Sequence, residues 1–179
     1  LTRGVLLGTL IFFGLSLLLI FRIFERPIFG TGRPLTPKIT QSVSKVAFLI
    51  LGMRLEIVGT PMRGRGAAVS NHTSWLDIFA LNAFDDIFFV AKSEVATWPV
   101  IGWLARATGT LFIDRDRTQA IKQTKIFQDR LRNGHRLLFF PEGTSSDGMR
   151  VLPFKSTLFQ SFFTPELRNK ISIQAITLV

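Results

Sequence analysis

An uncharged stretch near the amino end, from Gly4 to Phe21, restricts the fold of this chain more than any other feature. Leu, Ile and Phe dominate it. About 20 consecutive apolar residues are enough for a helix to cross a bilayer, and we therefore predict a membrane helix over residues 4–24. A buried soluble helix and a signal peptide are the alternatives. The signal peptide is disfavoured because the charged segment 22–26 stands where a small-residue cleavage site belongs.

The charges on the two sides of this stretch predict its orientation. Arg22, Arg26, Arg33 and Lys38 follow it, whereas Arg3 alone precedes it. Basic residues near a membrane helix favour the cytoplasmic side. We expect the rest of the chain on the cytoplasmic side of the inner membrane.

A second helix is expected at about residues 37–51, after a connector rich in Gly and Pro. Its apolar residues recur at helical spacing: Ile39, Val43, Val46, Ala47 and Ile50. This helix can lie on the membrane, on the first helix or on the domain that follows, and the sequence does not choose among the three. Residues 1–52 are thus predicted to form a membrane anchor of one or two helices.

Composition favours a membrane partner over nucleic acid. The chain of 179 residues has 22 Lys and Arg against 12 Asp and Glu, and it is 47% hydrophobic with 18 Phe. Basicity combined with high hydrophobicity suits an anionic membrane and phosphorylated substrates. We expect no nucleic-acid partner, since no recognised binding motif accompanies the charge. The absence of Cys excludes disulfides, a thiol nucleophile and thiolate metal sites.

From residue 53 to 179 short apolar runs alternate with helical patterns, which predicts an α/β domain with a mixed, largely parallel sheet flanked by helices. Strands are expected at 55–58, 66–70, 87–91, 110–113, 137–140 and 171–178. Helices are expected at 94–107, 117–132 and 157–163. The chain stops inside an apolar run, so we expect this domain to be truncated at its carboxyl end.

A histidine and a carboxylate five positions apart, His72 and Asp77, are the first candidates for catalysis. An imidazole can take a proton while a carboxylate fixes its tautomer. On a continuous helix the two side chains would point about 140° apart, so the pair requires a bend between them. The pattern Ser74-Trp75-Leu76-Asp77 resembles a capping box, with Ser74 as N-cap and His72 folded back before the helix. Alternatively, Asp77 only caps a helix and His72 is an ordinary loop residue.

Two later segments carry groups suited to an anion. Arg115 can hold a phosphate through a forked pair of hydrogen bonds, although residues 114–117 also fit a solvated charge run. Glu142-Gly143-Thr144 follows an expected strand, and its backbone N–H groups and hydroxyl suit an anion, with a plain turn as the alternative. Glu142 would repel phosphate, so we expect it to orient Arg115 or to accept a hydrogen bond from a substrate hydroxyl.

Taken in order, these segments resemble the glycerolipid acyltransferase family, which includes bacterial 1-acylglycerol-3-phosphate acyltransferases. His72 and Asp77 match the His-x4-Asp motif of the family. Residues 109–115 match its second motif and residues 140–145 its third. The resemblance covers about residues 50–179.

Two positions qualify the resemblance. Ala175 stands where the fourth motif of the family usually has Pro, which leaves the role of that segment open. Residues 145–148, Ser-Ser-Asp-Gly, are similar to a subgroup that also contains lyso-ornithine lipid acyltransferases. A lyso-ornithine lipid O-acyltransferase is therefore the alternative within the family.

The resemblance implies transfer of a fatty acyl group from acyl-CoA or acyl-carrier protein to the free hydroxyl of a lysophospholipid. The product from 1-acylglycerol-3-phosphate would be phosphatidic acid. His72 would deprotonate the hydroxyl and Asp77 would orient His72. The acceptor headgroup would be held by Arg115, Glu142, Gly143 and Thr144. The acyl thioester is a co-substrate, and neither a metal nor a further cofactor is expected.

Two functions outside this reading remain open from sequence. A metal-dependent phosphohydrolase would use His72, Asp77, Asp114 and Glu142 as ligands, since carboxylates suit Mg²⁺. A non-catalytic membrane protein with the same fold would bind lipid without transferring an acyl group.

Overall fold

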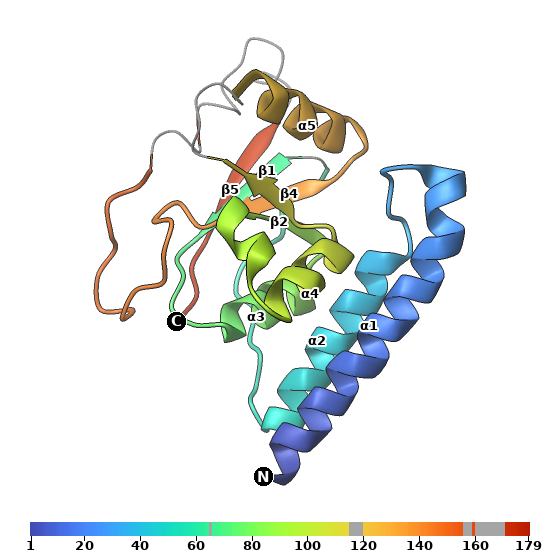
Figure 1. The fold of residues 1–179 in the computed structure, drawn as a ribbon. Coiled ribbons are helices and arrows are strands. Elements are labelled where there is room, and N and C mark those ends of the chain that lie inside the picture. The colour runs from blue at the N-terminus through green and yellow to red at the C-terminus, as the bar shows by residue number, and fades with distance from the viewer. Residues whose placement is uncertain (65, 115–119, 156–158, 160–170) are drawn as a thin grey trace.

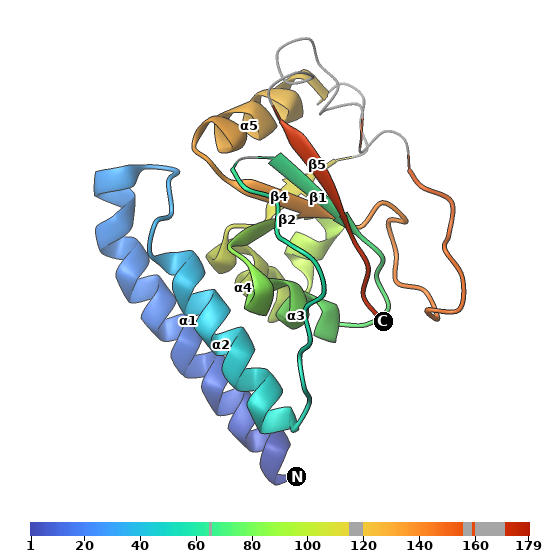
Figure 2. The same ribbon diagram turned by 180° about the vertical axis from the view of Figure 1, so that it is seen from behind.

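The computed structural model describes residues 1–64, 66–114, 120–155, 159 and 171–179. A pair of long helices lies beside an α/β unit in which helices cover a central sheet (Figure 1). The view from behind shows the same helical pair and α/β unit, and it places the last strand at the outer side of the sheet (Figure 2).

The first helix, α1 (Thr2–Phe29), extends beyond both ends of the predicted segment 4–24. It is long and apolar enough to cross a membrane, and only 6% of its most apolar window is buried in the protein. The second helix, α2 (Thr36–Leu51), confirms the predicted one. It packs on α1 on one side and on α3 (Leu76–Phe84) on the other, so it joins the hairpin to the domain.

Glu25 of α1 holds the turn of this hairpin. It is 2% exposed. One carboxylate oxygen accepts hydrogen bonds from the backbone N–H groups of Leu35 and Thr36, at 2.7 and 3.2 Å. The other accepts from the hydroxyl of Thr36 at 2.9 Å and from Arg22 at 3.2 Å. The residue before α2 makes no side-chain cap, so Glu25 supplies the acceptors that the first N–H groups of a helix require.

The described strands form one sheet in which every pairing is parallel. The order is β3-β2-β4-β1-β5. The strands are β1 (Gly66–Ser70), β2 (Ile87–Lys92), β3 (Leu111–Ile113), β4 (Arg136–Phe139) and β5 (Ser172–Ile176). The predicted α/β class is confirmed, with a sheet that is parallel throughout these strands.

Continuous apolar runs form the central strands because both faces of the sheet are covered. Side chains of a strand alternate between faces. Phe88 thus packs in a cluster with Phe127 and Leu131 of α5 (Ala120–Arg132), whereas Phe89 packs in a second cluster with Leu81 of α3.

Residues 55–58 are not a strand, contrary to the prediction. They form no ladder, and Val58 is 91% exposed. The chain that follows runs beside β5 through side-chain contacts instead. Gln174 accepts from the N–H of Met62 at 2.8 Å and donates to the carbonyl of Thr60 at 2.9 Å. These contacts hold residues 60–62, which follow the segment at 55–58, where alternating apolar residues alone did not specify a strand.

The predicted helix 94–107 is also wrong as one element. It is divided into a short 3-10 helix, η1 (Ser93–Thr97), and α4 (Ile101–Thr108). Pro99 cannot donate a helical hydrogen bond, and Val100 has a φ of 63°, which a β-branched residue rarely adopts. The chain therefore turns at this point rather than kinking within a helix.

The end of α5 agrees with the prediction. Gly134 has a φ of 78°, and its N–H donates to the carbonyl of Leu131 at 3.0 Å, as a helix C-cap requires. The predicted start of this helix and most of the predicted helix at 157–163 lie outside the described residues.

We predict that the hairpin depends on a close approach at Gly14. A β-carbon there would collide with Val43 of α2, whereas one at Gly8 would meet nothing within 4 Å. Gly14→Val should therefore destabilise the protein by about 1–3 kcal/mol through overpacking, relative to Gly8→Val. Thermal unfolding in detergent measures the difference. Equal unfolding temperatures for the two variants would contradict this packing.

Candidate active site

The candidate residues that the structure describes meet at the carboxyl edge of the sheet. β1 and β4 are parallel neighbours, and β2 pairs with β4 on its other side. Neighbouring strands lie about 4.8 Å apart. The loop after β1 carries His72, the loop after β4 begins at Phe140, and Lys92 ends β2. Parallel pairing thus brings together three segments that are far apart in sequence.

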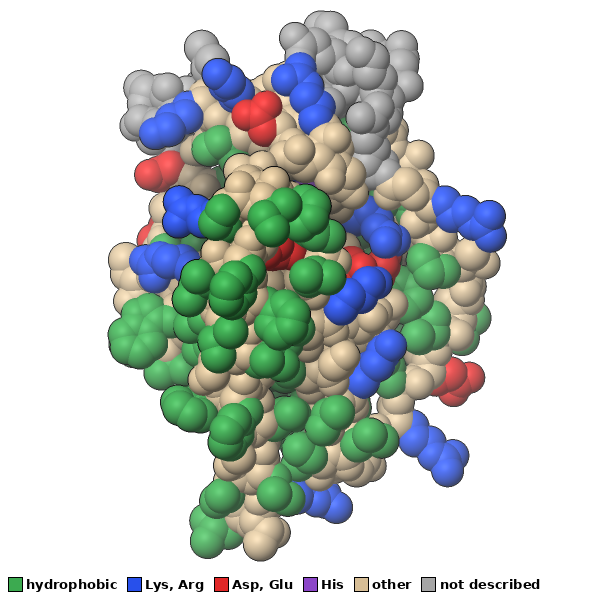
Figure 3. Space-filling model, turned by 90° about the vertical axis from the view of Figure 1, so that its right-hand side faces the viewer, with side chains coloured by type: hydrophobic (Ala, Val, Ile, Leu, Met, Phe, Trp, Pro, Cys, Tyr) green, Lys and Arg blue, Asp and Glu red, His purple; other side chains and the backbone are tan. Residues whose placement is uncertain are grey.

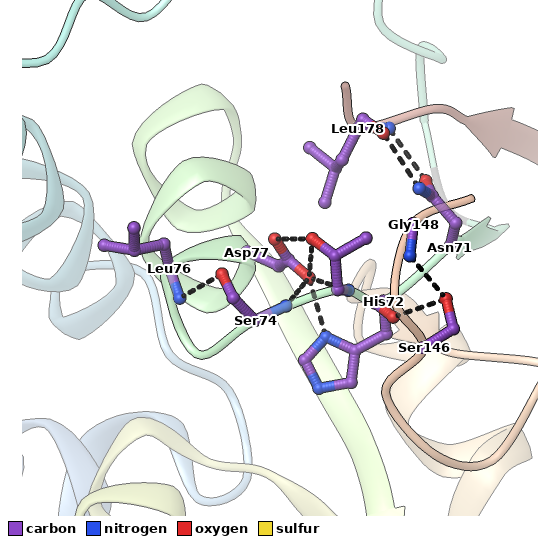
Figure 4. Close-up of polar contacts among 9 residues, drawn as sticks. Asn71, His72, Ser74, Leu76, Asp77, Ser146, Gly148 and Leu178 are labelled. Atoms are coloured by element: carbon purple, nitrogen blue, oxygen red, sulfur yellow. Dashed lines mark hydrogen bonds and ion pairs between the residues drawn. The ribbon is translucent and has the colours of Figure 1, made fainter.

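The predicted bend between His72 and Asp77 is present. His72 lies in the loop before α3, and Asp77 lies in the first turn of that helix. His72 Nδ1 is 2.8 Å from Asp77 Oδ2 (Figure 4). The side chain of Asp77 is 8% exposed and that of His72 is 21% exposed. The carboxylate is therefore sheltered, while part of the imidazole remains accessible.

Asp77 is held by more than the histidine. Its Oδ2 also accepts from the backbone N–H groups of Thr73 and Ser74, at 2.6 and 2.9 Å. Burial by itself raises the pKa of Asp77, but these hydrogen bonds and the contact with His72 outweigh burial and hold the pKa below its usual range. The carboxylate is thus ionised at neutral pH.

The capping reading is confirmed in part. Asp77 reaches back to the N–H of Ser74, and the hydroxyl of Ser74 accepts from the N–H of Leu76 at 3.2 Å. The regular helix begins one residue later than expected, with Trp75 as its N-cap. Helix capping and orientation of His72 are therefore carried out by the same carboxylate oxygen.

The position of His72 is fixed from the second loop as well. Its carbonyl accepts from the N–H of Ser146 at 2.8 Å. Its ring stacks on Phe140, with centroids 4.1 Å apart and planes inclined by 14°. Sequence reasoning missed this role of Phe140, although an aromatic residue directly after β4 was a visible signal. With Nδ1–H directed at Asp77, Nε2 is the ring atom left to accept a proton.

The side chain of Asn71 binds the chain that follows β5. Its side-chain Nδ2 donates to the backbone carbonyl of Leu178 at 2.8 Å, and its side-chain Oδ1 accepts from the backbone N–H of Leu178 at 2.8 Å (Figure 4). The chain after β5 is therefore fixed beside the candidate pair. Ala175 is part of β5 and pairs with Val69, so the departure at the fourth motif does not remove the strand.

Glu142 is buried in the loop after β4, and its expected role toward Arg115 or a substrate hydroxyl stays a prediction. It is 2% exposed, and Oε2 accepts from the N–H of Leu152 at 3.1 Å. Oε1 is buried and makes no hydrogen bond with the residues that the structure describes. Glu142 thus fixes the loop that returns at Leu152. Arg115, which it was expected to orient, lies outside the described residues.

Two lysines flank Gly143, which has a φ of 72°. A β-carbon on Gly143 would lie 3.4 Å from Lys155 Cγ and 3.8 Å from Lys92 Cε. The N–H of Lys155 donates to the carbonyl of Pro141 at 2.8 Å, which keeps this segment against the loop. Thr144 is exposed beside them. Gly143 therefore lies between the aliphatic parts of two lysine side chains, and the sequence alone did not indicate Lys92 at this position.

The ligand set of the alternative phosphohydrolase is not brought together. Among the described residues, no three His, Asp or Glu side chains form a group that could hold a metal ion. Asp77 is directed at His72, and Glu142 at the backbone of Leu152.

The fold and this site define an acyltransferase domain. The family model for acyltransferases matches residues 55–178, and the chain belongs to that family.

Two relatives are named as acyltransferases of lysolipids. The chain is 53% identical over 175 residues to a lyso-ornithine lipid O-acyltransferase of Rhodobacter capsulatus, and it covers 63% of that protein. It is 39% identical over 123 residues to a 1-acyl-sn-glycerol-3-phosphate acyltransferase of Neisseria gonorrhoeae and covers 48% of it. The matched region is 98% of this chain in the first case and 67% in the second.

The fold also has a solved counterpart. It is similar to the crystal structure of the 1-acyl-sn-glycerophosphate acyltransferase PlsC from Thermotoga maritima, with a TM-score of 0.62 and 24% identity. The match covers 96% of this chain and 72% of that one, so the similarity includes the helical hairpin as well as the sheet.

We expect Asp77→Asn to lower the rate of acyl transfer by roughly 10²–10⁴-fold, because a neutral amide does not stabilise an imidazolium as a carboxylate does. The variant should remain folded, since an amide oxygen can still accept the backbone N–H groups. Initial rates and thermal unfolding, measured on the same preparation, check both statements. Asp129→Asn, at a half-exposed carboxylate on α5, should leave the rate unchanged.

Proposed function

We propose that this protein transfers a fatty acyl group from a thioester to the free hydroxyl of a membrane lysolipid, with lyso-ornithine lipid as the acceptor. The observation that carries the chemistry is the contact of 2.8 Å between His72 Nδ1 and the sheltered carboxylate of Asp77. This contact leaves Nε2 of an accessible imidazole available as a general base. Similarity to the Rhodobacter relative supports the choice of acceptor.

The reaction needs no covalent enzyme intermediate. His72 Nε2 takes the proton of the acceptor hydroxyl as its oxygen attacks the carbonyl carbon of the thioester. The new C–O bond forms, the C–S bond breaks, and the thiolate takes the proton back from the imidazolium. Asp77 stabilises the imidazolium between the two proton transfers. The chain has no Cys to serve as an acyl carrier.

The donor we propose is acyl-CoA or acyl-carrier protein, and the location is the cytoplasmic side of the inner membrane. The long apolar α1 supports membrane attachment. Arg22, Arg26 and Arg33 follow its apolar part and support a cytoplasmic domain. Attachment at the bilayer would hold the active site where lysolipid and acyl product reside.

A second acceptor, 1-acylglycerol-3-phosphate, is favoured by the two lysines beside Gly143. A phosphate dianion suits a pair of ammonium groups. The ornithine headgroup carries one carboxylate and one ammonium, and its carboxylate can use the same pair at lower charge. Similarity to the Neisseria relative also supports this acceptor.

An assay of both acceptors decides between them. Membranes containing the protein are offered lyso-ornithine lipid or 1-acylglycerol-3-phosphate, each with acyl-CoA and with acyl-carrier protein. We expect faster transfer to lyso-ornithine lipid and loss of transfer to both acceptors in His72→Ala. Faster transfer to 1-acylglycerol-3-phosphate would make that lysolipid the preferred acceptor. Full transfer by folded His72→Ala would refute the base.

We predict that the double substitution Lys92→Gln and Lys155→Gln raises the KM for 1-acylglycerol-3-phosphate at least tenfold while kcat changes little. Each hydrogen bond to a charged group contributes about 1.5–3 kcal/mol, which corresponds to about tenfold or more in binding. The KM for lyso-ornithine lipid should rise less. Lys122→Gln with Lys125→Gln makes the same change of charge at exposed positions of α5 and should leave both KM values unaltered.

A further inference from the structure

A large groove lies at the edge of the sheet opposite the candidate active site. Its volume is about 850 Å³. It is bounded by α1, the connector at 30–33, α4 and α5. Arg130 of α5 reaches the ring of Phe88 near the start of β2, with Cζ 4.5 Å from the ring centroid. His72 follows the carboxyl ends of the strands, and β2 spans roughly 17 Å between these edges.

One half of the groove is strongly basic. Its described lining includes five arginines and no acidic residue: Arg22, Arg26, Arg33, Arg106 and Arg130. The carboxylate of Glu25, which lies next to Arg26 in α1, is buried and already binds Arg22 together with the start of α2. The positive charge of this wall is therefore largely uncompensated.

Three of these arginines are fixed in place by backbone carbonyls. Arg22 donates to Gly30 and Gly32 at 2.7 and 2.9 Å. Arg33 donates to Ala107 at 2.6 Å, and Arg130 donates to Gly109 at 3.0 Å. The bond from Arg33 joins the hairpin to the domain, whereas those of Arg22 and Arg130 lie within the hairpin and within the domain. All three arginines line the same groove. The site is thus a built cluster rather than a set of freely moving surface charges.

Burial and the crowded positive charges together lower the pKa values of two groups beside the groove. Burial, followed by the charges of Arg33 and Arg22, lowers the pKa of Arg130 to about 10. Burial, followed by the charge of Arg130, lowers the pKa of His135 to about 4. A bound anion would offset this positive potential.

The other half of the groove is apolar. Leu15 and Leu19 of α1 line it, together with Trp103 of α4, which is 70% exposed. The leucines lie one to two turns before Arg22, within the stretch suited to a membrane. On the face that carries α1, hydrophobic side chains form a broad area bordered by Lys and Arg (Figure 3). Exposed Trp beside such a surface is typical of the membrane interface.

We propose that this groove binds an anionic phospholipid, with its phosphate on the arginine cluster and an acyl chain along Leu15, Leu19 and Trp103. A phospholipid combines an anionic phosphate with acyl chains, so one molecule can contact both the arginines and the apolar residues of the groove. Arginine suits phosphate because its guanidinium forms forked hydrogen bonds. An acidic protein would satisfy the arginines but would leave the apolar half exposed.

Such a lipid would be separate from the acyl acceptor, because the groove and His72 lie at opposite edges of the sheet. It would fix the depth and rotation of the domain at the membrane surface. The proposal does not depend on which lysolipid is acylated, nor on acyl transfer itself.

The test uses the whole protein in phosphatidylcholine vesicles that contain a minor fraction of bromine-labelled lipid. Bromine on the acyl chains quenches nearby tryptophan, and Trp103→Phe gives the part of the signal that comes from Trp103. We expect labelled phosphatidylglycerol to quench Trp103 several-fold more effectively than labelled phosphatidylcholine. Equal quenching by both lipids would overturn the proposal.

Arg26 and Arg106 are the residues to change, since both are exposed and line the groove. Each arginine near an anionic surface contributes about fivefold in binding, so Arg26→Gln with Arg106→Gln should remove the preference. Arg54→Gln with Arg63→Gln makes the same change of charge at exposed positions outside the groove and should retain it. Equal loss in both double variants would indicate unspecific surface charge and refute a site.

Two competitors separate the lipid from other anions. Inorganic phosphate should not displace labelled phosphatidylglycerol, because it has no acyl chain to occupy the apolar half. Acyl-carrier protein at stoichiometric amounts should not displace it either. Displacement by phosphate alone would overturn the lipid as the ligand, and displacement by the carrier protein would assign the groove to protein docking instead.

Discussion

Parallel pairing of β1 with β4 is the constraint on which the site depends. Because the two strands run in the same direction, the loops that follow them meet at one edge of the sheet. His72 in one loop can therefore stack on Phe140 and bind the N–H of Ser146 in the other. Pairing of β2 with the far side of β4 brings Lys92 to the same edge. The geometry of the site therefore depends on strand order as much as on residue identity.

Asp77 shows how one carboxylate can serve fold and function together. It accepts backbone N–H groups at the start of α3 and the ring N–H of His72 through the same oxygen. A helix start needs acceptors for its free N–H groups, and a general base needs a fixed tautomer. The bend that satisfies the first requirement also satisfies the second. The two readings of this motif are therefore compatible.

The hairpin contributes more than attachment to a membrane. Glu25 of α1 caps α2, and Arg33 of the connector binds the carbonyl of Ala107 in the domain. These bonds give the two helices a fixed place beside the sheet and gather arginines at their end. In the proposal made above, an anionic lipid at this end and a lysolipid at the opposite edge would together set the domain on the membrane surface.

The sequence by itself determined the apolar helix, the alternation that gives an α/β fold, and the spacing of His72 and Asp77. Each of these is a pattern among residues that are close in sequence, so it can be recognised without knowledge of the fold. The sequence-based prediction failed at residues 55–58, which form no ladder, and at Val100, where the predicted helix is interrupted. Only the tertiary structure decided that Phe140, Lys92 and Lys155 lie beside the pair, and that the arginines form a groove. Those contacts depend on strand order and helix packing, which join residues far apart in the chain.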